Sequence, residues 1–262
     1  MNDRILSHTV TGEGPPVLLL HGLGGDHEQS LALLAPEERC TRIAPDLPGH
    51  GETDLADDEP ATFDHFAARV ADLLDELMPH TAMPIIGVSM GAGVALALTA
   101  ARPDLVTRLV LIRPAWLTTN PVRNLAAFEV VAELLRAAGP TAGAEAFAGN
   151  DILQDIEREA PAMAQSLLGQ FRRPHAQERA RVLARLPHSL PLPDRAAYEK
   201  TTVNSLVLVA PEDPVHPLAL GVAMAEWLPN ARLELLPRKL ADATEHQLAL
   251  QRAVAAHLGE AE

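Results

Sequence analysis

Residues 83–101 read MPIIGVSMGAGVALALTAA, and the centre of this stretch is Gly87-Val88-Ser89-Met90-Gly91. A short apolar run leads into a serine with a glycine two residues away on each side, and an Ala/Leu-rich segment follows. This pattern predicts a strand, a sharp turn and a helix. Small flanking residues permit the strained backbone that the turn requires, and the helix N-terminus then faces any anion formed there. The stretch therefore predicts a nucleophile elbow centred on Ser89; the alternative is a tight turn whose serine only caps the helix.

Size and composition indicate a folded protein that acts on a small molecule. The chain has 262 residues, 47% hydrophobic residues and a formal net charge of −14, which argues against disorder and against nucleic-acid binding. No apolar stretch approaches the ~18 residues of a membrane span, and the N-terminal residues are too polar for a signal peptide. Cys40 is the only cysteine, which favours a reducing compartment. We therefore expect a cytoplasmic protein without nucleic-acid or membrane partners; the sequence leaves its oligomeric state open.

Apolar runs and helical patterns alternate along the chain. The runs typical of buried strands are residues 17–20, 41–44, 85–88, 109–112, 205–209 and 233–236. Apolar residues recur at helical spacing over residues 63–77, 218–228 and 247–258. An alternation of strands and helices predicts an α/β fold with a mostly parallel, doubly wound sheet.

The alternation stops between about residues 115 and 202. This region has helical patches at 125–138, 152–168 and 177–186, no strand-like run, and a proline-dense end at 187–193. A connection of this length favours an inserted helical lid, and the alternative is a set of helices that simply pack on the sheet. We expect a core formed by residues 1–114 and 203–262, with a cap or lid formed by residues 115–202.

A glycine-rich loop, His21-Gly22-Leu23-Gly24-Gly25, follows the first long apolar run. Its small residues let the backbone approach a ligand closely. Acyl-transfer chemistry needs two N–H donors at the developing oxyanion, and the natural pair is Leu23 and Met90, the residue after the serine. We expect these two residues, together with Gly22 and His21, to form the oxyanion and substrate-binding part of the site.

Four motifs, taken in order, resemble those of the α/β-hydrolase fold superfamily. They are HGLGG at 21–25, PDLPGHGETD at 45–54, GVSMG at 87–91 and LVLVAPEDPVHP at 206–217. They span most of the chain outside the expected lid. The resemblance implies an eight-stranded sheet, here without its first strand, and a helical cap. It also implies a triad of nucleophile, acid and histidine in that chain order, with no metal or organic cofactor.

Asp213 stands where this superfamily carries its triad acid, after the apolar run that ends at Ala210. A carboxylate at this place fixes the tautomer of an imidazole and stabilises the imidazolium. The alternatives are a turn without catalytic duty and Glu212 as the acid. Some relatives carry the acid one strand earlier, but Arg113 occupies that position here. Such an arginine forms a structural ion pair or meets an anionic substrate.

The histidine departs from the pattern of the superfamily. The usual Gly-His pair lies about four residues past the proline that ends the last strand, and this position is Ala241. The expected base is therefore His246, five positions later, in a helix that Asp242 or Thr244 caps. Three other histidines lie at predicted strand ends near the site and are alternatives: His21, His50 and His216. The absence of any catalytic histidine is the remaining alternative.

The expected function is a serine hydrolase that cleaves a small carboxylic ester, thioester, amide or lactone through an acyl-serine. Ser89 is the nucleophile, Asp213 the acid and His246 the base. One alternative is a lyase-like, cyclase-like or haloperoxidase-like relative that uses the same pocket for other chemistry. Another is an impaired member that only binds a ligand, because a serine hydroxyl without a base is a poor nucleophile near neutral pH.

Overall fold

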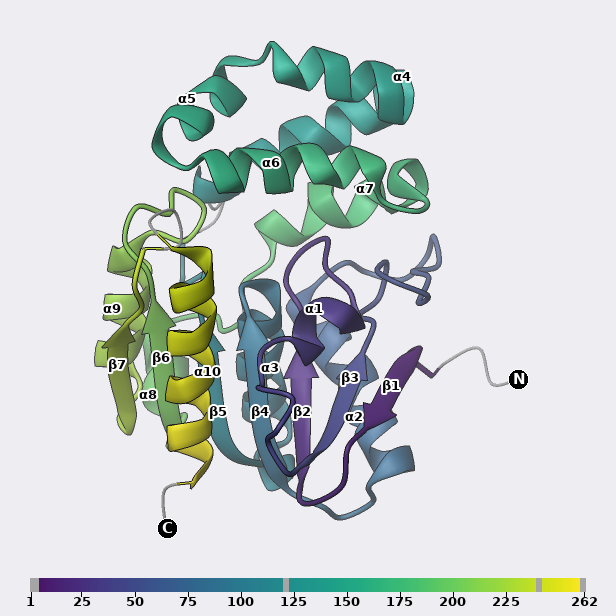
Figure 1. Cartoon of the computed structure of the whole chain (residues 1–262). Helices are drawn as coiled ribbons and strands as arrows, with labels where there is room; N and C mark the ends of the chain where they lie inside the picture. Colours follow the sequence, from purple (N-terminus) through teal and green to yellow (C-terminus); the bar gives the residue numbers. More distant parts are fainter. Residues whose placement is uncertain (1–4, 120–122, 239–241, 260–262) are drawn as a thin grey trace.

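A computed structural model describes residues 5–119, 123–238 and 242–259, and Figure 1 shows its seven-stranded sheet with helices on both faces. The strands are β1 (His8–Thr11), β2 (Pro16–Leu20), β3 (Thr41–Pro45), β4 (Met83–Val88), β5 (Val106–Ile112), β6 (Asn204–Val209) and β7 (Ala231–Leu235). Their order is β1-β3-β2-β4-β5-β6-β7, and only β1 runs antiparallel to its neighbour. The predicted α/β fold is confirmed.

Each of the six apolar runs forms a strand. Five of them are buried for most of their length between helices on the two faces of the sheet, whereas Leu233 and Leu235 in β7, at the edge of the sheet, are exposed. Strand β1 was not predicted. Its four residues, HTVT, are half-buried or exposed at the edge of the sheet and include a single large apolar side chain. An edge strand with this composition has no apolar run by which the sequence could reveal it.

Helices cover the two faces of the sheet unequally (Figure 1). On one face lie α2 (Phe63–Leu77), α3 (Met90–Ala101), α8 (Arg195–Glu199) and α9 (Leu218–Trp227), and on the other lie α1 (His27–Leu31) and α10 (Ala243–Gly259). The apolar side chains of the two faces form separate buried clusters. Among the described residues, no helix combines the length and the apolar character that a membrane crossing requires.

Four helices between β5 and β6 lie beyond the carboxyl ends of the strands, and we call them the cap helices (Figure 1). They are α4 (Ala126–Ala148), α5 (Asp151–Glu159), α6 (Pro161–Gly169) and α7 (Ala176–Arg185). The patch predicted at 152–168 is two helices, because the helix ends at Ala160 and Pro161 opens the next one. A proline fits the first turn of a helix but interrupts an interior.

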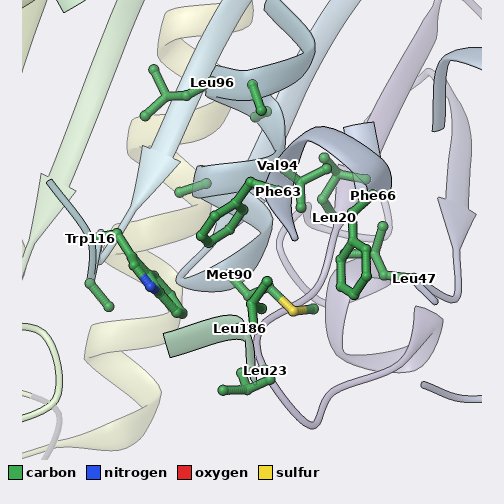
Figure 2. Close-up of a cluster of buried hydrophobic side chains, with 14 of the residues drawn as sticks. Leu20, Leu23, Leu47, Phe63, Phe66, Met90, Val94, Leu96, Trp116 and Leu186 are labelled. Atoms are coloured by element: carbon green, nitrogen blue, oxygen red, sulfur yellow. The ribbon is translucent and has the colours of Figure 1, made fainter. Parts of the chain in front are cut away.

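A buried cluster joins the sheet, α3 and the cap, and Figure 2 shows its central side chains. The Phe63 ring packs against Gly93 of α3, where a Cβ would collide with it. Trp116, which follows β5, meets this ring edge-on, with 5.0 Å between the ring centroids. Leu186, just after the last cap helix, lies close to Met90 (Figure 2). Burial of each such side chain contributes about 1.5–3 kcal/mol to the stability of the fold, so packing fixes the position of the start of α3.

Candidate active site

The predicted strand, turn and helix of residues 83–101 are β4, Ser89 and α3. Ser89 has φ 53° and ψ −111°, a left-handed backbone that costs energy in a residue other than glycine. Its N–H donates to the Ile112 carbonyl at 2.8 Å, which ties the turn to the neighbouring strand. A Cβ at Gly87 would collide with the Gly91 carbonyl, and a Cβ at Gly91 would collide with the Leu20 carbonyl. These two glycines allow the helix to start close against the sheet.

Ser89 lines a cavity of about 140 Å³ between the carboxyl ends of the strands and the cap helices. Apolar side chains on the cap side include Phe128 and Met163, and Ser166 is a polar neighbour on the same side. The strand side carries the titratable groups of the cavity: Arg113, Glu212, Asp213, His216, Arg238 and His246. The hydroxyl therefore faces a partly open cavity, with charged groups on one side and mainly apolar groups on the other.

His216 is the histidine whose ring contacts the serine. Its Nε2 lies 2.9 Å from Ser89 Oγ, and its Nδ1 lies 2.8 Å from Asp213 Oδ2. The ring is almost fully buried, with 5% of the side chain exposed. Hydroxyl, imidazole and carboxylate thus form a continuous chain of hydrogen bonds, the arrangement of a nucleophile, a base and an acid.

The partners of the His216 ring fix its tautomer. An ionised carboxylate only accepts hydrogen bonds, so Nδ1 carries the proton and donates it to Asp213. The other nitrogen, Nε2, is then free to accept the hydroxyl proton of Ser89. This tautomer is the one in which the imidazole can act as a general base towards the serine.

The loop after β6 holds the acid and the histidine as one local unit. Asp213 Oδ1 accepts the backbone N–H groups of Val215 at 3.2 Å and His216 at 3.1 Å. The His216 N–H also lies 3.2 Å from the Asp213 carbonyl. Turns of this kind are a common use of aspartate. The carboxylate therefore orients the imidazole both directly and through the backbone that carries it.

Arg113 is a further charged partner of this unit. It follows β5 with φ 48°, and its N–H donates to the Leu208 carbonyl at 2.7 Å. Its Nε lies 3.1 Å from Asp213 Oδ2. Its Nη2 also lies 3.1 Å from His216 Nδ1, but a guanidinium only donates and Nδ1 already donates to Asp213, so these two nitrogens are close without sharing a hydrogen bond. Burial raises the pKa of Asp213, but His216 and Arg113 outweigh it and hold this pKa well below its usual value. Asp213 is therefore ionised at neutral pH.

The structure does not bring the expected His246 to Ser89. Asp242 accepts the N–H groups of Thr244 and Glu245, so it caps α10 and places His246 in the first turn. There the buried ring lies with its Nδ1 2.7 Å from the Pro237 carbonyl. It lines the cavity without forming the contact that His216 makes. Ala241, the usual position of the histidine in the superfamily, lies outside the described residues.

The glycine-rich loop supplies backbone groups beside Ser89. Leu23 lines the cavity, and Met90 is the first residue of α3, where an N–H has no partner within the helix. The Gly22 N–H is already used, since it donates to Gln29 Oε1 at 2.7 Å. The sequence did not single out Gln29, which is exposed overall and has no distinguishing motif. Its amide fixes the loop next to Leu23.

His21 holds the same loop from the inside. Its Nε2 accepts the Leu47 N–H at 2.9 Å, so the proton is on Nδ1, which donates to the Gly22 carbonyl at 2.9 Å. The ring is fully buried, and burial lowers its pKa to about 4. His50 is also buried, with its Nδ1 3.1 Å from the Pro48 carbonyl. Neither of these rings makes the contact with Ser89 that His216 makes.

Within the described ranges, no group of three or more His, Cys, Asp or Glu side chains has an arrangement that could hold a metal ion.

Comparisons with known proteins identify the family of this chain. The sequence model of the alpha/beta hydrolase fold family matches residues 15–239. A 2-hydroxymuconate semialdehyde hydrolase from Pseudomonas putida is 28% identical over 86% of this chain and 79% of its own length. A pyrrolizixenacetamide deacetylase from Xenorhabdus hominickii is 31% identical over 52% of this chain. The chain spans about half the length of that deacetylase.

Solved structures show the same fold. A thermophilic esterase from Thermogutta terrifontis superimposes with a TM-score of 0.72 over 96% of this chain and 93% of its own, at 23% identity. The fold, the elbow and the family match lead to one assignment: the chain belongs to the α/β-hydrolase fold family. The relatives that it matches include hydrolases and esterases.

Proposed function

We propose that this protein is a serine hydrolase in which Ser89 is the nucleophile, His216 the base and Asp213 the acid. The observation that carries the proposal is the pair of contacts made by the His216 ring, 2.9 Å to Ser89 Oγ and 2.8 Å to Asp213 Oδ2. Both distances lie within the range for proton transfer by a positioned side chain. The substrate class is a small carboxylic ester, thioester, amide or lactone.

Acylation begins when His216 Nε2 takes the hydroxyl proton and Ser89 Oγ attacks the substrate carbonyl. Asp213 stabilises the imidazolium that forms, because its ionised carboxylate accepts from Nδ1. The N–H groups of Leu23 and Met90 receive the oxyanion. The imidazolium then gives its proton to the leaving group, and the acyl group remains on Ser89.

Deacylation repeats these steps with water. His216 Nε2 removes a proton from a water molecule, the hydroxide oxygen attacks the acyl carbonyl, and the same two amides stabilise the second oxyanion. The proton returns to Ser89 Oγ when the ester bond breaks and the carboxylic acid leaves.

The cavity supports a compact acyl group. A volume of about 140 Å³ accommodates on the order of ten non-hydrogen atoms. The cap side of the cavity is largely apolar, with Phe128 and Met163 among its side chains, which suits a short aliphatic or small cyclic acyl chain. The cap helices act as the lid in this proposal, because they line the side of the cavity opposite the strands. A deacetylase and an esterase among the relatives are consistent with this choice.

An impaired or merely ligand-binding relative is less well supported. That alternative rested on the missing histidine after the last strand, and His216 supplies an imidazole from a different loop. No contact in the site favours a lyase-like or haloperoxidase-like reaction over hydrolysis.

The test is covalent labelling with a fluorophosphonate, followed by mass spectrometry of the intact protein. We expect the wild type to gain one adduct, Ser89→Ala to gain none and His216→Ala to react at least a hundredfold more slowly. Ser166→Ala is the matched control, because Ser166 lines the same cavity from a cap helix. Equal labelling of the wild type and Ser89→Ala would remove the proposal.

A further inference from the structure

A second cavity, of about 270 Å³, lies on the other side of the glycine-rich loop from Ser89. Gly22 and Leu23 line the Ser89 cavity, whereas Gly24 and Gly25 line this one, so the loop is the wall between them. Its remaining walls come from the start of α1 and the loop after β3, with four carboxylates: Asp26, Glu28, Asp46 and Glu52. The cap contributes three further side chains: Gln170, Arg173 and Arg179. The proposed hydrolysis uses none of these three side chains.

The cap is basic where it meets this cavity, although the chain is acidic overall. Residues 172–185 include five arginines and a single acidic residue, in a protein with a formal net charge of −14. Arg181 is occupied, since its Nη1 donates to the Asp57 carbonyl at 2.6 Å and its Nη2 to the Leu55 carbonyl at 2.9 Å. Arg173 and Arg179 line the cavity instead.

Three polar atoms at this cavity are buried and lack a hydrogen-bond partner in the described part of the chain. They are the Nε atoms of Arg173 and Arg179 and the Oε1 atom of Gln170. Gln170 is only 2% exposed, and its amide occupies the space that a Cβ on Gly24 would take. Two N–H donors and one acceptor are thus desolvated without compensation, which is costly unless a ligand satisfies them.

Carboxylates near the cavity do not satisfy these donors. Asp46 accepts the His27 N–H at 2.8 Å with one oxygen and the Glu52 N–H at 2.9 Å with the other. Asp26 caps α1 by accepting the Gln29 N–H at 3.2 Å. Asp54 lies 3.7 Å from Arg179 Nη2 and is almost fully exposed. Asp26 and Asp46 therefore bind backbone groups, and the other two carboxylates that line the cavity, Glu28 and Glu52, belong to exposed residues, as does Asp54.

The two arginines also raise each other's energy. Burial lowers the pKa of Arg173, and the nearby charge of Arg179 acts in the same direction against the attraction of Asp26. His50, another lining residue, has its pKa lowered by burial and by His21, so it adds no charge at neutral pH. An anion between the two guanidinium groups would relieve the repulsion between them.

We propose that this cavity binds a small oxyanion, a carboxylate or a phosphate, that also carries a hydroxyl group. The anion accepts from Arg173 and Arg179, and the hydroxyl donates to Gln170 Oε1. Arginine forks match the geometry of both oxyanions. The inference goes beyond the proposed function, because this binding does not require Ser89.

Titration calorimetry with inorganic phosphate and with glycolate tests the site, at an ionic strength held constant with sodium chloride. We expect saturable binding to the wild type and to Ser89→Ala, which separates this result from any failure of the hydrolase proposal. Arg173→Gln and Arg179→Gln should each weaken binding about tenfold or more. Arg172→Gln is the matched control, because Arg172 is exposed and does not line the cavity.

Absence of binding to the wild type overturns the inference, as does equal weakening by Arg172→Gln and Arg173→Gln. If Arg173→Gln fails to fold, Arg179→Gln and Gln170→Leu carry the test. Two esters that differ only in a neutral or a carboxylate-bearing leaving group then identify the source of the anion. A KM for the anionic ester that is lower in the wild type, but not in Arg173→Gln, makes the anion part of the substrate. If the wild type binds the anion in calorimetry but has equal KM values for the two esters, the anion is a separate ligand and not part of the substrate.

Discussion

The histidine after β6 and the histidines after β2 and β7 occupy similar places in the fold but have different partners. His216 contacts a carboxylate and a hydroxyl, both of which belong to side chains. His21 bonds the Gly22 carbonyl and the Leu47 N–H, and His246 contacts the Pro237 carbonyl. All three rings are buried. The comparison teaches that proximity to the carboxyl ends of the strands does not make a histidine a base; its partners do.

Main-chain partners give a histidine a structural duty. A ring that donates to one backbone carbonyl and accepts from another N–H is fixed as neutral, because protonation would break the second bond. A ring between a carboxylate and a hydroxyl gains from protonation at the moment of attack, because the carboxylate stabilises the new charge. The difference predicts that substitution of a ring with main-chain partners alters mainly stability, whereas substitution of a ring between a carboxylate and a hydroxyl alters mainly turnover.

The largest effect is expected for His216→Ala, because it removes the base. Loss of a triad histidine leaves only the acceleration due to the oxyanion groups and substrate binding, so kcat should fall about 10³-fold or more. Hydrolysis of a p-nitrophenyl ester measures this fall, and added imidazole should restore part of the rate. A variant that retains wild-type kcat would show that the contact with Ser89 has no catalytic role.

Asp213→Asn tests the other partner of the same ring. The asparagine amide can donate to Nδ1, which moves the ring proton to Nε2 and prevents Nε2 from accepting the hydroxyl proton of Ser89. The corresponding change in a serine protease lowers kcat about 10⁴-fold, and we expect a fall of about 10²- to 10⁴-fold in kcat here. Glu212→Gln is the control in the same loop, and it should leave kcat within about threefold of the wild type.

Parts of the fold and of the candidate site were predictable from the sequence. The sheet and the elbow were predictable, because apolar runs and the spacing of two glycines around Ser89 depend on short stretches of chain. The sequence also predicted Asp213 from its place after a strand, and the structure brings this side chain to His216. For the base, the sequence left several histidines open and ranked His246 first, whereas the ring that contacts Ser89 is that of His216. The missed signal is the spacing of Asp213 and His216, three residues apart in a turn, where a carboxylate can bind both the backbone and the ring.

The second cavity and the contact between Gln29 and Gly22 had no such local signal. They depend on which side chains the cap and the loops bring together, and this arrangement follows from tertiary packing. Gln170 and Arg173 lie between the helical patches predicted at 152–168 and 177–186, in a segment to which the sequence analysis assigned no motif. Only the position of the cap over the glycine-rich loop brings these residues to the same cavity as Gly24.

His21→Gln should alter stability more than turnover. The folded-state pKa of His21 is about 4, below its ordinary 6.5, so the unfolded chain binds a proton first as the pH falls. The contribution of neutral His21 to the free energy of unfolding is complete above about pH 6.5 and is lost as the pH falls towards 4. The total loss is on the order of 3 kcal/mol. Urea unfolding at pH 7 and pH 5 should show a smaller pH dependence for His21→Gln, which lacks this titration.

The control for His21 is His80→Asn. His80 is exposed with φ 58°, a conformation that asparagine tolerates, so the substitution should leave the pH dependence of unfolding unchanged. An identical pH dependence in the wild type and His21→Gln would show that the acid sensitivity arises elsewhere. The hydrogen bonds of His21 to main-chain groups would then not account for a pH-dependent stability.

The smallest effect on chemistry is expected for His246→Asn, and it separates the two loops most directly. The variant loses the contact of Nδ1 with the Pro237 carbonyl, at a cost to stability of about 1 kcal/mol, but leaves the Ser89–His216–Asp213 chain in place. We expect kcat within about threefold of the wild type, and any change to appear in KM, because His246 lines the cavity. Steady-state kinetics on the same ester measures both constants. A fall in kcat as large as that expected for His216→Ala would indicate that His246, after β7, takes part in catalysis as the base.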